Sequence, residues 1–295
     1  MGISISHLTK QFGTKMALND FTLTIDNGMF GLLGPNGAGK STLMRMLCTL
    51  LAPSGGSAVL NGVPLTQKRE IRRMIGYLPQ DFSFYPHFSV YETLDYLGLL
   101  SGMKDTKTRS RRIGEMLEIT NLSGSRKAKV RQLSGGMRRR LGIAQVLLHD
   151  PKIVIVDEPT AGLDPEERIR FRNLLASLSG GKTVLFSTHI SEDILHTCPN
   201  VAVLNKGRLL YTGGIRELTQ RAQGKVWQVR IDATQMASLS ASHSVIATVP
   251  KEGGYDVRLL ADRMPFPGAV PAPPGLEDGY MLLVKGGEAC AADMV

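Results

Sequence analysis

The chain has 295 residues, of which 42% are hydrophobic and 21% charged, a composition typical of a globular protein with a sizeable core. Its net charge of +9 suits phosphate groups, anionic lipid or nucleic acid as partners. No run approaches the roughly 18 apolar residues of a spanning helix, the start has no apolar signal core, and the three scattered cysteines favour reduced thiols in the cytosol.

Residues 1 to about 28 alternate apolar and polar side chains, a pattern that predicts half-buried antiparallel strands. The apolar run "MFGLL" follows and leads into a glycine-rich stretch at residues 34–42. Beyond it, one apolar face at helical spacing predicts a helix, and this face is formed by Leu43, Met46, Leu47, Leu50 and Leu51.

Helical periodicity dominates residues 82 to about 150, which we expect to form a helical subdomain inserted into an α/β core. The periodicity is visible in "SVYETLDYLGLL", in "RSRRIGEMLEI" and in a stripe of Met137, Leu141, Ala144 and Leu148. After it come two fully apolar runs that end in polar residues, "KIVIVDEP" and "KTVLFSTH". Such runs are typical of parallel strands buried on both faces, whose carboxyl ends bind ligands in open α/β sheets.

The last part of the chain predicts a change of domain. A hairpin at "VAVLNKGRLLYTGG" ends the core, so we place the first domain at residues 1–218. Residues 219–295 are expected to form a small α+β extension, with strands at "VWQVRID" and "YDVRLLA" around a short helix at "TQMASLSA". A proline-rich segment, "MPFPGAVPAPPG", should be extended, and "LEDGYMLLV" offers a short final element.

The glycine-rich stretch matches the phosphate-loop pattern G-x-x-x-x-G-K-[ST] between a strand and a helix. It consists of Gly34, Pro35, Asn36, Gly37, Ala38, Gly39, Lys40, Ser41 and Thr42. Its glycines let the backbone wrap phosphates, Lys40 would neutralise the β- and γ-phosphates, and the Ser41 hydroxyl would bind Mg²⁺. The alternative is a glycine-rich turn before a helix.

Polar residues at the ends of the predicted strands supply candidate catalytic groups. Asp157 suits a contact to Mg²⁺, and Glu158 suits a general base beside the γ-phosphate. Gln80 is predicted to contact Mg²⁺ and the attacking water, and His189 to hydrogen-bond the γ-phosphate. Singly, each of the last two also fits an ordinary loop residue or a satisfied core histidine.

A second anion site is predicted at "LSGGMRRRLGIAQ", residues 133–145, where Ser134, Gly135 and Gly136 precede a basic helix. This stretch has no lysine like that of the phosphate loop. Farther on, "LDPEE" predicts a capping box of Asp164 and Glu167 with Pro165 at the first helical position. A capping role leaves room for a second role of Asp164 across an interface.

Taken in order, "GPNGAGKST", "YLPQ", "LSGGM", "IVIVDEPTAGLD" and "STH" resemble the ATP-binding cassette of ABC transporters over residues 3 to about 218. The resemblance implies an α/β P-loop NTPase core with an antiparallel β subdomain and ATP and Mg²⁺ as cofactors. It also implies two cassettes packed head to tail, where Ser134, Gly135 and Gly136 contact ATP held by the other subunit. Phe12 would stack on adenine, although a core position in its strand is the alternative.

The same resemblance implies the motor subunit of a transporter, working with a separate membrane permease at the cytoplasmic face of the membrane. A homodimer and the export direction are expected, and a nucleic-acid partner is not; the alternative is a soluble ABC ATPase acting on ribosomes or nucleic acid. Met137 departs from the family's usual glutamine. An aromatic-rich segment either borders the permease groove or fills the helical subdomain's own core; it contains Phe82, Phe84, Tyr85, Phe88, Tyr91 and Tyr96.

Overall fold

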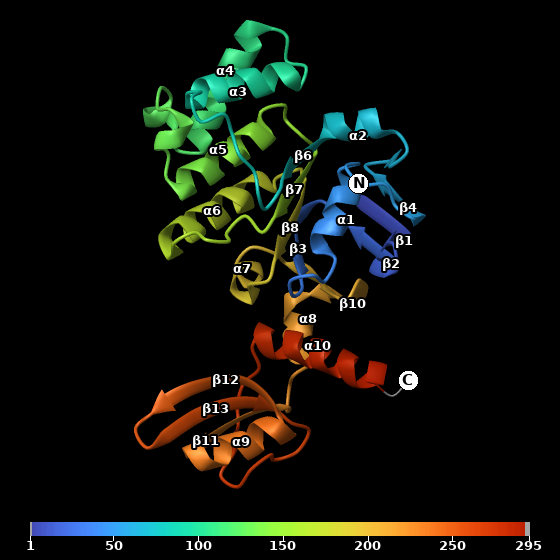
Figure 1. The fold of residues 1–295 in the computed structure, drawn as a ribbon, viewed down its shortest axis with the longest axis vertical. Helices are drawn as coiled ribbons and strands as arrows, with labels where there is room; N and C mark the ends of the chain where they lie inside the picture. Colours follow the sequence, from blue (N-terminus) through green and yellow to red (C-terminus); the bar gives the residue numbers. More distant parts are fainter. Residues whose placement is uncertain (1, 293–295) are drawn as a thin grey trace. The chain divides into compact units, whose positions relative to one another are not determined.

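The computed structural model describes the backbone of residues 2–292 and the side chains of residues 2–285. By its internal packing the chain forms two compact units (Figure 1). The first runs to Pro199 and includes Leu204–Leu209, and the second contains Asn200–Val203 and the chain from Leu210 onward. The predicted functional boundary at residue 218 stays a prediction.

The N-terminal part of the first unit is an antiparallel sheet, as the alternating pattern predicts. Its strands, in the order β2-β1-β4-β5, are β1 (Ile3–Phe12), β2 (Lys15–Ile25), β4 (Gly55–Leu60) and β5 (Val63–Pro64). Apolar residues such as Ile3, Ile5 and Leu23 are buried, while the polar residues between them are exposed. The sheet therefore has one covered face and one face in water.

The core of the first unit is a parallel sheet. It includes, in the order β3-β8-β7-β6, the strands β3 (Gly28–Leu33), β8 (Thr183–Thr188), β7 (Ile153–Asp157) and β6 (Ile75–Leu78). Every residue of β7 and β8 is buried, as their continuous apolar runs predict. Because parallel strands end at the same edge, the polar residues that follow them gather there.

The predicted hairpin that follows β8 in the chain is confirmed. It consists of β9 (Asn200–Asn205) and β10 (Arg208–Gly214), which are neighbours in the sheet. The turn residues Lys206 and Gly207 have φ angles of 47° and 77°, as a type I′ turn requires. The Gly207 N–H donates to the Ala38 carbonyl (2.9 Å), which ties the turn to the phosphate loop.

The helices of the first unit outside the helical segment are α1 (Lys40–Leu47), α2 (Lys68–Met74), α6 (Pro165–Leu178) and α7 (Ser191–Leu195). Helix α1 is shorter than its apolar face predicts. Thr49 adopts a left-handed φ of 58°, so the chain leaves the helix before Leu50, whose side chain is 61% exposed. The expectation that Leu50 and Leu51 continue the helical face is therefore wrong.

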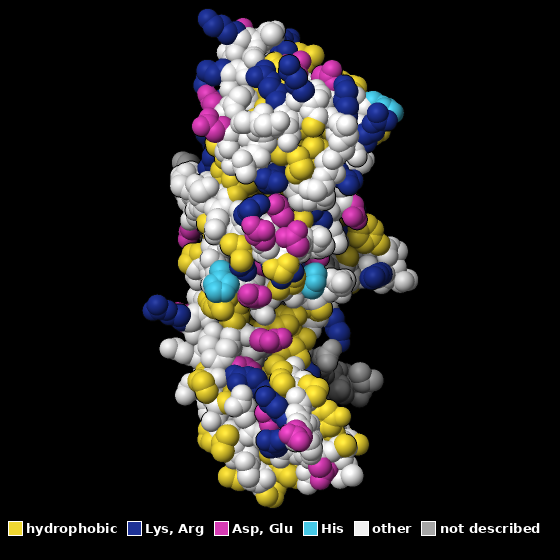
Figure 2. Space-filling view, turned by 90° about the vertical axis from the view of Figure 1, so that its left-hand side faces the viewer, with side chains coloured by type: hydrophobic (Ala, Val, Ile, Leu, Met, Phe, Trp, Pro, Cys, Tyr) yellow, Lys and Arg dark blue, Asp and Glu magenta, His cyan; other side chains and the backbone are white. Residues whose placement is uncertain are grey.

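The predicted helical segment is confirmed by α3 (Val90–Leu100), α4 (Thr106–Ile119) and α5 (Gly135–Leu147). Helix α3 begins with a capping box formed by Ser89 and Glu92. The three helices contact one another, and Leu94, Ile113 and Leu141, one from each helix, are buried. Figure 2 shows Lys and Arg side chains gathered over this part of the viewed face.

The second unit contains a four-stranded antiparallel sheet in the order β12-β13-β11-β14. Its elements are α8 (Ile215–Gln220), β11 (Val226–Ile231), α9 (Ala233–Ser242), β12 (Ser244–Lys251), β13 (Gly254–Leu260), β14 (Val270–Pro271) and α10 (Leu276–Ala292). The predicted strands and short helix are confirmed, but β12 was not predicted. Within residues 2–292, no helix combines the length and apolar character needed to cross a bilayer.

The buried cysteines fit the prediction of reduced thiols. Cys48 and Cys198 are buried and unpaired. Burial raises the pKa of both thiols, to about 12 for Cys198, which keeps them protonated and unreactive. The side chain of Cys290 lies outside the described residues.

Candidate nucleotide site

The phosphate loop, residues 34–42, joins the end of β3 to the start of α1. Gly39 is the N-cap of α1 and has a φ of 109°, and a Cβ there would lie 2.6 Å from the Ala17 carbonyl oxygen. Only glycine fits this position without strain. Helix α1 starts at Lys40, so the unpaired N–H groups of its first turn face the loop, an arrangement that favours anions.

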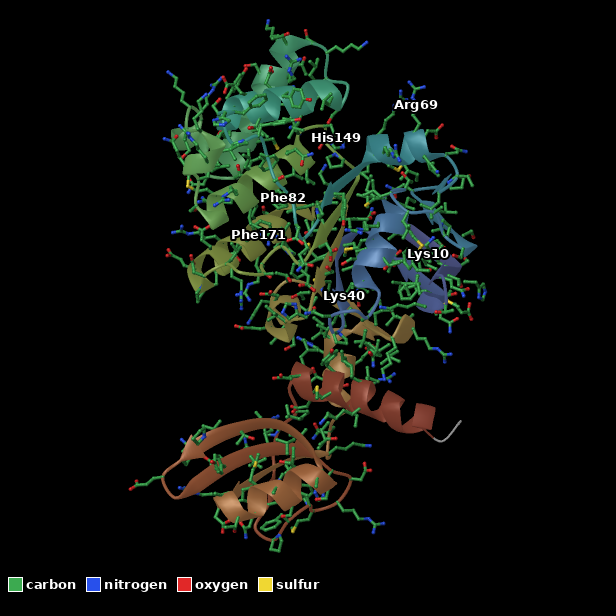
Figure 3. All side chains as sticks on the ribbon, in the orientation of Figure 1. Lys10, Lys40, Arg69, Phe82, His149 and Phe171 are labelled. Carbon is green, nitrogen blue, oxygen red and sulfur yellow. The ribbon has the colours of Figure 1, made fainter. Side chains whose placement is uncertain are left out.

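Lys40 lies at the start of α1 and is 4% exposed (Figure 3). Its ammonium donates to the carbonyls of Gly34 (2.7 Å) and Pro35 (3.2 Å). It also forms an ion pair with Glu158 Oε1 at 3.2 Å. A buried positive charge is therefore fixed where the loop backbone wraps a phosphate.

Glu158 follows β7 and is held from several sides. Its N–H donates to the carbonyl and the hydroxyl of Ser187, both at 3.1 Å. Its Oε2 lies 3.0 Å from His189 Nδ1, while Oε1 contacts Lys40. Its φ of 44° is left-handed, a conformation that costs a non-glycine residue about 1–3 kcal/mol. Strain of this kind at a charged, 6% exposed carboxylate is typical of a functional position.

The predicted Mg²⁺ ligands come from three elements. Asp157 ends β7, is 2% exposed, and accepts a hydrogen bond of 2.6 Å from the Ser187 hydroxyl. Ser41 lies in the first turn of α1, and Gln80 follows β6. Ser41 and Gln80 line the same cleft as Lys40. Carboxylate, hydroxyl and amide oxygens are ligands that Mg²⁺ accepts, so the donor set fits this ion.

The cleft around the phosphate loop has a volume of about 800 Å³, enough for a nucleotide. Its lining consists of Phe12, Lys15, Met16, Ala17, Asn36, Gly37, Ala38, Gly39, Lys40, Ser41, Thr42, Gln80, Glu158 and Lys206. Phe12 is 49% exposed, which excludes the core position considered as its alternative. The Lys10 ammonium lies 5.0 Å from the centre of the Phe12 ring. The ring thus forms an accessible apolar wall suited to a base.

We expect Phe12→Ala to weaken ATP binding about 2- to 12-fold, because a stacked aromatic pair contributes about 0.5–1.5 kcal/mol. The melting temperature should change little, since the ring is half exposed. Titration with a fluorescent ATP analogue and a thermal melt measure the two effects, and Phe12→Trp should keep the affinity. Unchanged affinity in the alanine variant would disprove stacking.

Sequence patterns did not identify two basic residues of the cleft, Lys15 and Lys206. Lys15 begins β2 directly after the turn that follows Phe12, and Lys206 lies in the hairpin turn. A lysine in or next to a tight turn is ordinarily a solvent-exposed residue, so only the folded arrangement places both beside the phosphate loop.

Ser134 caps the start of α5, and its hydroxyl accepts a hydrogen bond of 3.2 Å from the Met137 N–H. Ser134 and Gly135 are exposed, as an anion site requires. Gly136 is buried, and a Cβ there would lie 2.6 Å from Glu167 Oε2. The cap uses the backbone of residue 137, so replacement of the family's glutamine by Met137 leaves it intact.

This signature stretch does not share the cleft of the phosphate loop. Among the described residues, the lining of that cleft does not include Ser134, Gly135 or Gly136. Gly135 instead lines a separate groove of about 590 Å³, together with Gln80 and Phe82. The two predicted phosphate-binding motifs of one chain therefore line different pockets, which adjoin at Gln80.

Asp164 is exposed and caps α6, where its Oδ1 accepts a hydrogen bond of 2.9 Å from the Glu167 N–H. This half of the predicted capping box is confirmed. The Glu167 carboxylate pairs with Arg140 (3.5 Å) and Arg170 (3.1 Å) rather than with the backbone of Asp164, so the reciprocal half is wrong. A role of Asp164 at an interface stays a prediction.

The aromatic segment after Gln80 forms two small groups. Tyr85, Phe88 and Tyr96 contact one another, with ring centres 5.1–5.9 Å apart. Phe82 and Phe84 form an edge-to-face pair at 5.4 Å. None of these five rings is fully buried, and Tyr85 is 58% exposed. Tyr85 is thus open to a partner, whereas Phe82, Phe84 and Phe88 are half buried, and the choice between a permease contact and packing in the helical segment stays a prediction.

Comparison with known proteins agrees with this geometry. The family model described as "ABC transporter" matches residues 18–161. An uncharacterized ABC transporter ATP-binding protein of Bacillus subtilis, YxlF, is 37% identical over 261 residues, which are 88% of this chain and 87% of that protein. The Nod factor export ATP-binding protein I of Cupriavidus pinatubonensis is 40% identical over 219 residues, 73% of this chain and 67% of that protein.

Solved structures extend the match to the fold. A structure described as a dimeric bacterial ABC transporter cassette is 27% identical, has a TM-score of 0.66, and is matched over 72% of this chain and 98% of its own length. The predicted P-loop α/β fold and the resemblance are thus confirmed. This chain belongs to the ATP-binding subunits of ABC transporters, and it is an ATPase.

Proposed function

We propose that this chain binds ATP with Mg²⁺ in the cleft of the phosphate loop and hydrolyses it with Glu158 as the general base. The observation that carries the proposal is the position of the Glu158 carboxylate between the Lys40 ammonium (3.2 Å) and the His189 imidazole (3.0 Å). Both partners are groups that a phosphate attracts. When Lys40 and His189 turn to phosphate oxygens, the carboxylate becomes free to accept a proton from water.

Different residues of the cleft contact different parts of the nucleotide in this proposal. Backbone N–H groups of residues 36–42 and Lys40 hold the phosphates, and Phe12 packs against the base. Ser41, Gln80 and Asp157 are the residues that would hold Mg²⁺, which supplies charge neutralisation of the phosphates when bound. Gln80 and His189 orient water and phosphate around the carboxylate of Glu158.

We further propose that two copies pair head to tail and enclose two ATP molecules. The exposed Ser134 and Gly135 lie at a helix start outside the cleft of their own chain, which supports a role on the partner's nucleotide. The structural neighbour described as dimeric gives the same support. Bound ATP then joins two surfaces and adds free energy to the pair.

In this proposal the paired subunits drive a separate membrane permease from the cytoplasmic face of the membrane, in the direction of export. The relative named as a Nod factor export protein supports this direction. Exposed aromatic residues after Gln80, such as Tyr85 and Tyr96, suit contact with the permease.

The test is purification of the tagged full-length chain, with its genomic neighbours, from membranes solubilised in detergent. We expect recovery with a membrane protein whose removal changes the ATPase rate, and we expect Glu158→Gln to abolish the rate of the whole complex. Recovery with ribosomes, or ATPase activity stimulated by nucleic acid at physiological salt, would contradict the proposal and favour a soluble ABC ATPase.

A further inference from the structure

The basic run Arg138–Arg140 follows the signature stretch on α5, and its middle member reaches across to the catalytic segment. The Arg139 guanidinium donates to the carbonyl of Ala161 (3.2 Å) and approaches that of Glu158 (3.5 Å). These are backbone contacts to the turn that directly follows β7. Arg138, in contrast, is exposed.

The turn that Arg139 contacts sets the orientation of the Glu158 side chain. Glu158 has a left-handed φ, a backbone conformation that costs free energy and needs neighbouring hydrogen bonds to hold it. On one side Ser187 binds the Glu158 N–H, and within the turn the Ala161 N–H donates to the Glu158 carbonyl (3.3 Å). Arg139 reaches this turn from the helical segment.

Arg139 also lies against the segment that follows Gln80. Its guanidinium is 5.8 Å from the centre of the Phe82 ring. One turn farther along α5, a Cβ at Gly142 would lie 2.8 Å from the Phe82 ring, so glycine makes room for it. Burial lowers the pKa of Arg139, and the charges of Asp81 and Glu158 oppose this effect. A guanidinium remains charged in such a place.

We propose that Arg139 is a positioning residue for ATP hydrolysis, which holds the turn after β7 so that the Glu158 carboxylate keeps its catalytic direction. The inference rests on the proposed role of Glu158 as the base. Because Ser134 begins the same helix and Phe82 follows Gln80 closely, Arg139 joins three motifs of one chain.

The test compares Arg139→Ala and Arg139→Lys with the matched control Arg138→Ala from the same basic run. For Arg139→Ala we expect kcat to fall about 10-fold or more, with KM for ATP within about twofold, because the nucleotide cleft is not touched. Arg139→Lys should recover part of kcat, since its ammonium still donates to a carbonyl. Arg138→Ala should behave like the wild type.

A double-mutant cycle separates positioning from a general structural role. In the Glu158→Gln background, Arg139→Ala should lower the remaining hydrolysis no further, because its effect passes through Glu158. Single-turnover measurements give these slow rates. The double variant should still form the ATP-bound pair that Glu158→Gln accumulates. If Arg139→Ala does not fold in thermal melts, Arg139→Gln, which fills similar space, takes its place in the cycle.

Several results would overturn the inference: additive losses in the cycle, a loss in KM rather than kcat, or an equal loss in Arg138→Ala. Failure of the underlying function gives a different pattern. If Glu158→Gln keeps nearly normal turnover, Glu158 is not the base. If Glu158→Gln is inactive but Arg139→Ala is not impaired, only the positioning role of Arg139 is wrong.

Discussion

Replacing Glu158 by glutamine should lower ATP hydrolysis by about 100-fold or more while ATP still binds. Glutamine keeps the size of the side chain and can donate or accept a hydrogen bond, but it cannot take a proton from water. It also removes the negative partner of Lys40, which lies 3.2 Å away. Lys40 is then free to bind phosphate, so the ATP-bound pair should accumulate.

The measurements are phosphate release at saturating ATP and size-exclusion chromatography with and without ATP. His189→Ala is the companion variant. The His189 ring lies 3.0 Å from the Glu158 carboxylate, but in our proposal it does not accept the proton from water. It should lose activity and should not accumulate the pair as strongly. Turnover close to normal in Glu158→Gln would show that another group accepts the proton.

A mixture of two inactive variants should regain ATP-dependent pairing if the signature acts on the partner's nucleotide. Lys40→Ala removes the buried ammonium of the phosphate loop, and Ser134→Arg removes the cap of α5 and fills the anion site. In a head-to-tail pair of one of each, one site carries both defects and the other carries none. The intact site should bind ATP across the interface.

Each variant alone is the control, and ATP-dependent crosslinking reports pairing. Subunit exchange in the mixture is checked first with differently labelled copies. If each signature served its own chain, every site would keep one defect and mixing would restore nothing. Failure of pairing to recover in a mixture that exchanges subunits would therefore contradict the head-to-tail arrangement, whereas hydrolysis is a weaker readout because both sites can be required together.

Most of the fold could be predicted because a strand or helix that buries one face needs apolar residues at the spacing of that face. The continuous apolar runs at β7 and β8 and the alternation at β1 each indicated the correct strand type. Helix α1 was extended too far because Leu50 and Leu51 keep the helical spacing, although the left-handed Thr49 ends the helix. Strand β12 was missed since it is an edge strand that contains Pro250, and its apolar residues do not alternate regularly with polar ones.

The candidate site was recognisable in its parts but not in its contacts. Motif spacing identified Lys40, Glu158 and His189, yet their ion pair and hydrogen bond depend on how three strands align at one sheet edge. The same holds for Arg139, whose basic run has the pattern of a solvated surface. The Arg139 side chain points toward the segment of Glu158 because of how α5 packs, and this packing cannot be predicted from periodicity.

The hydrogen bond from the Met137 N–H to the Ser134 hydroxyl bears on how such subunits are found in genomes. Every amino acid except proline supplies that N–H, so natural selection is free to vary position 137 as far as the cap is concerned. A search profile that demands glutamine there would discard chains of this kind. Such a profile should instead give weight to Ser134, to Gly136, where a side chain would clash with Glu167, and to the absence of proline at position 137.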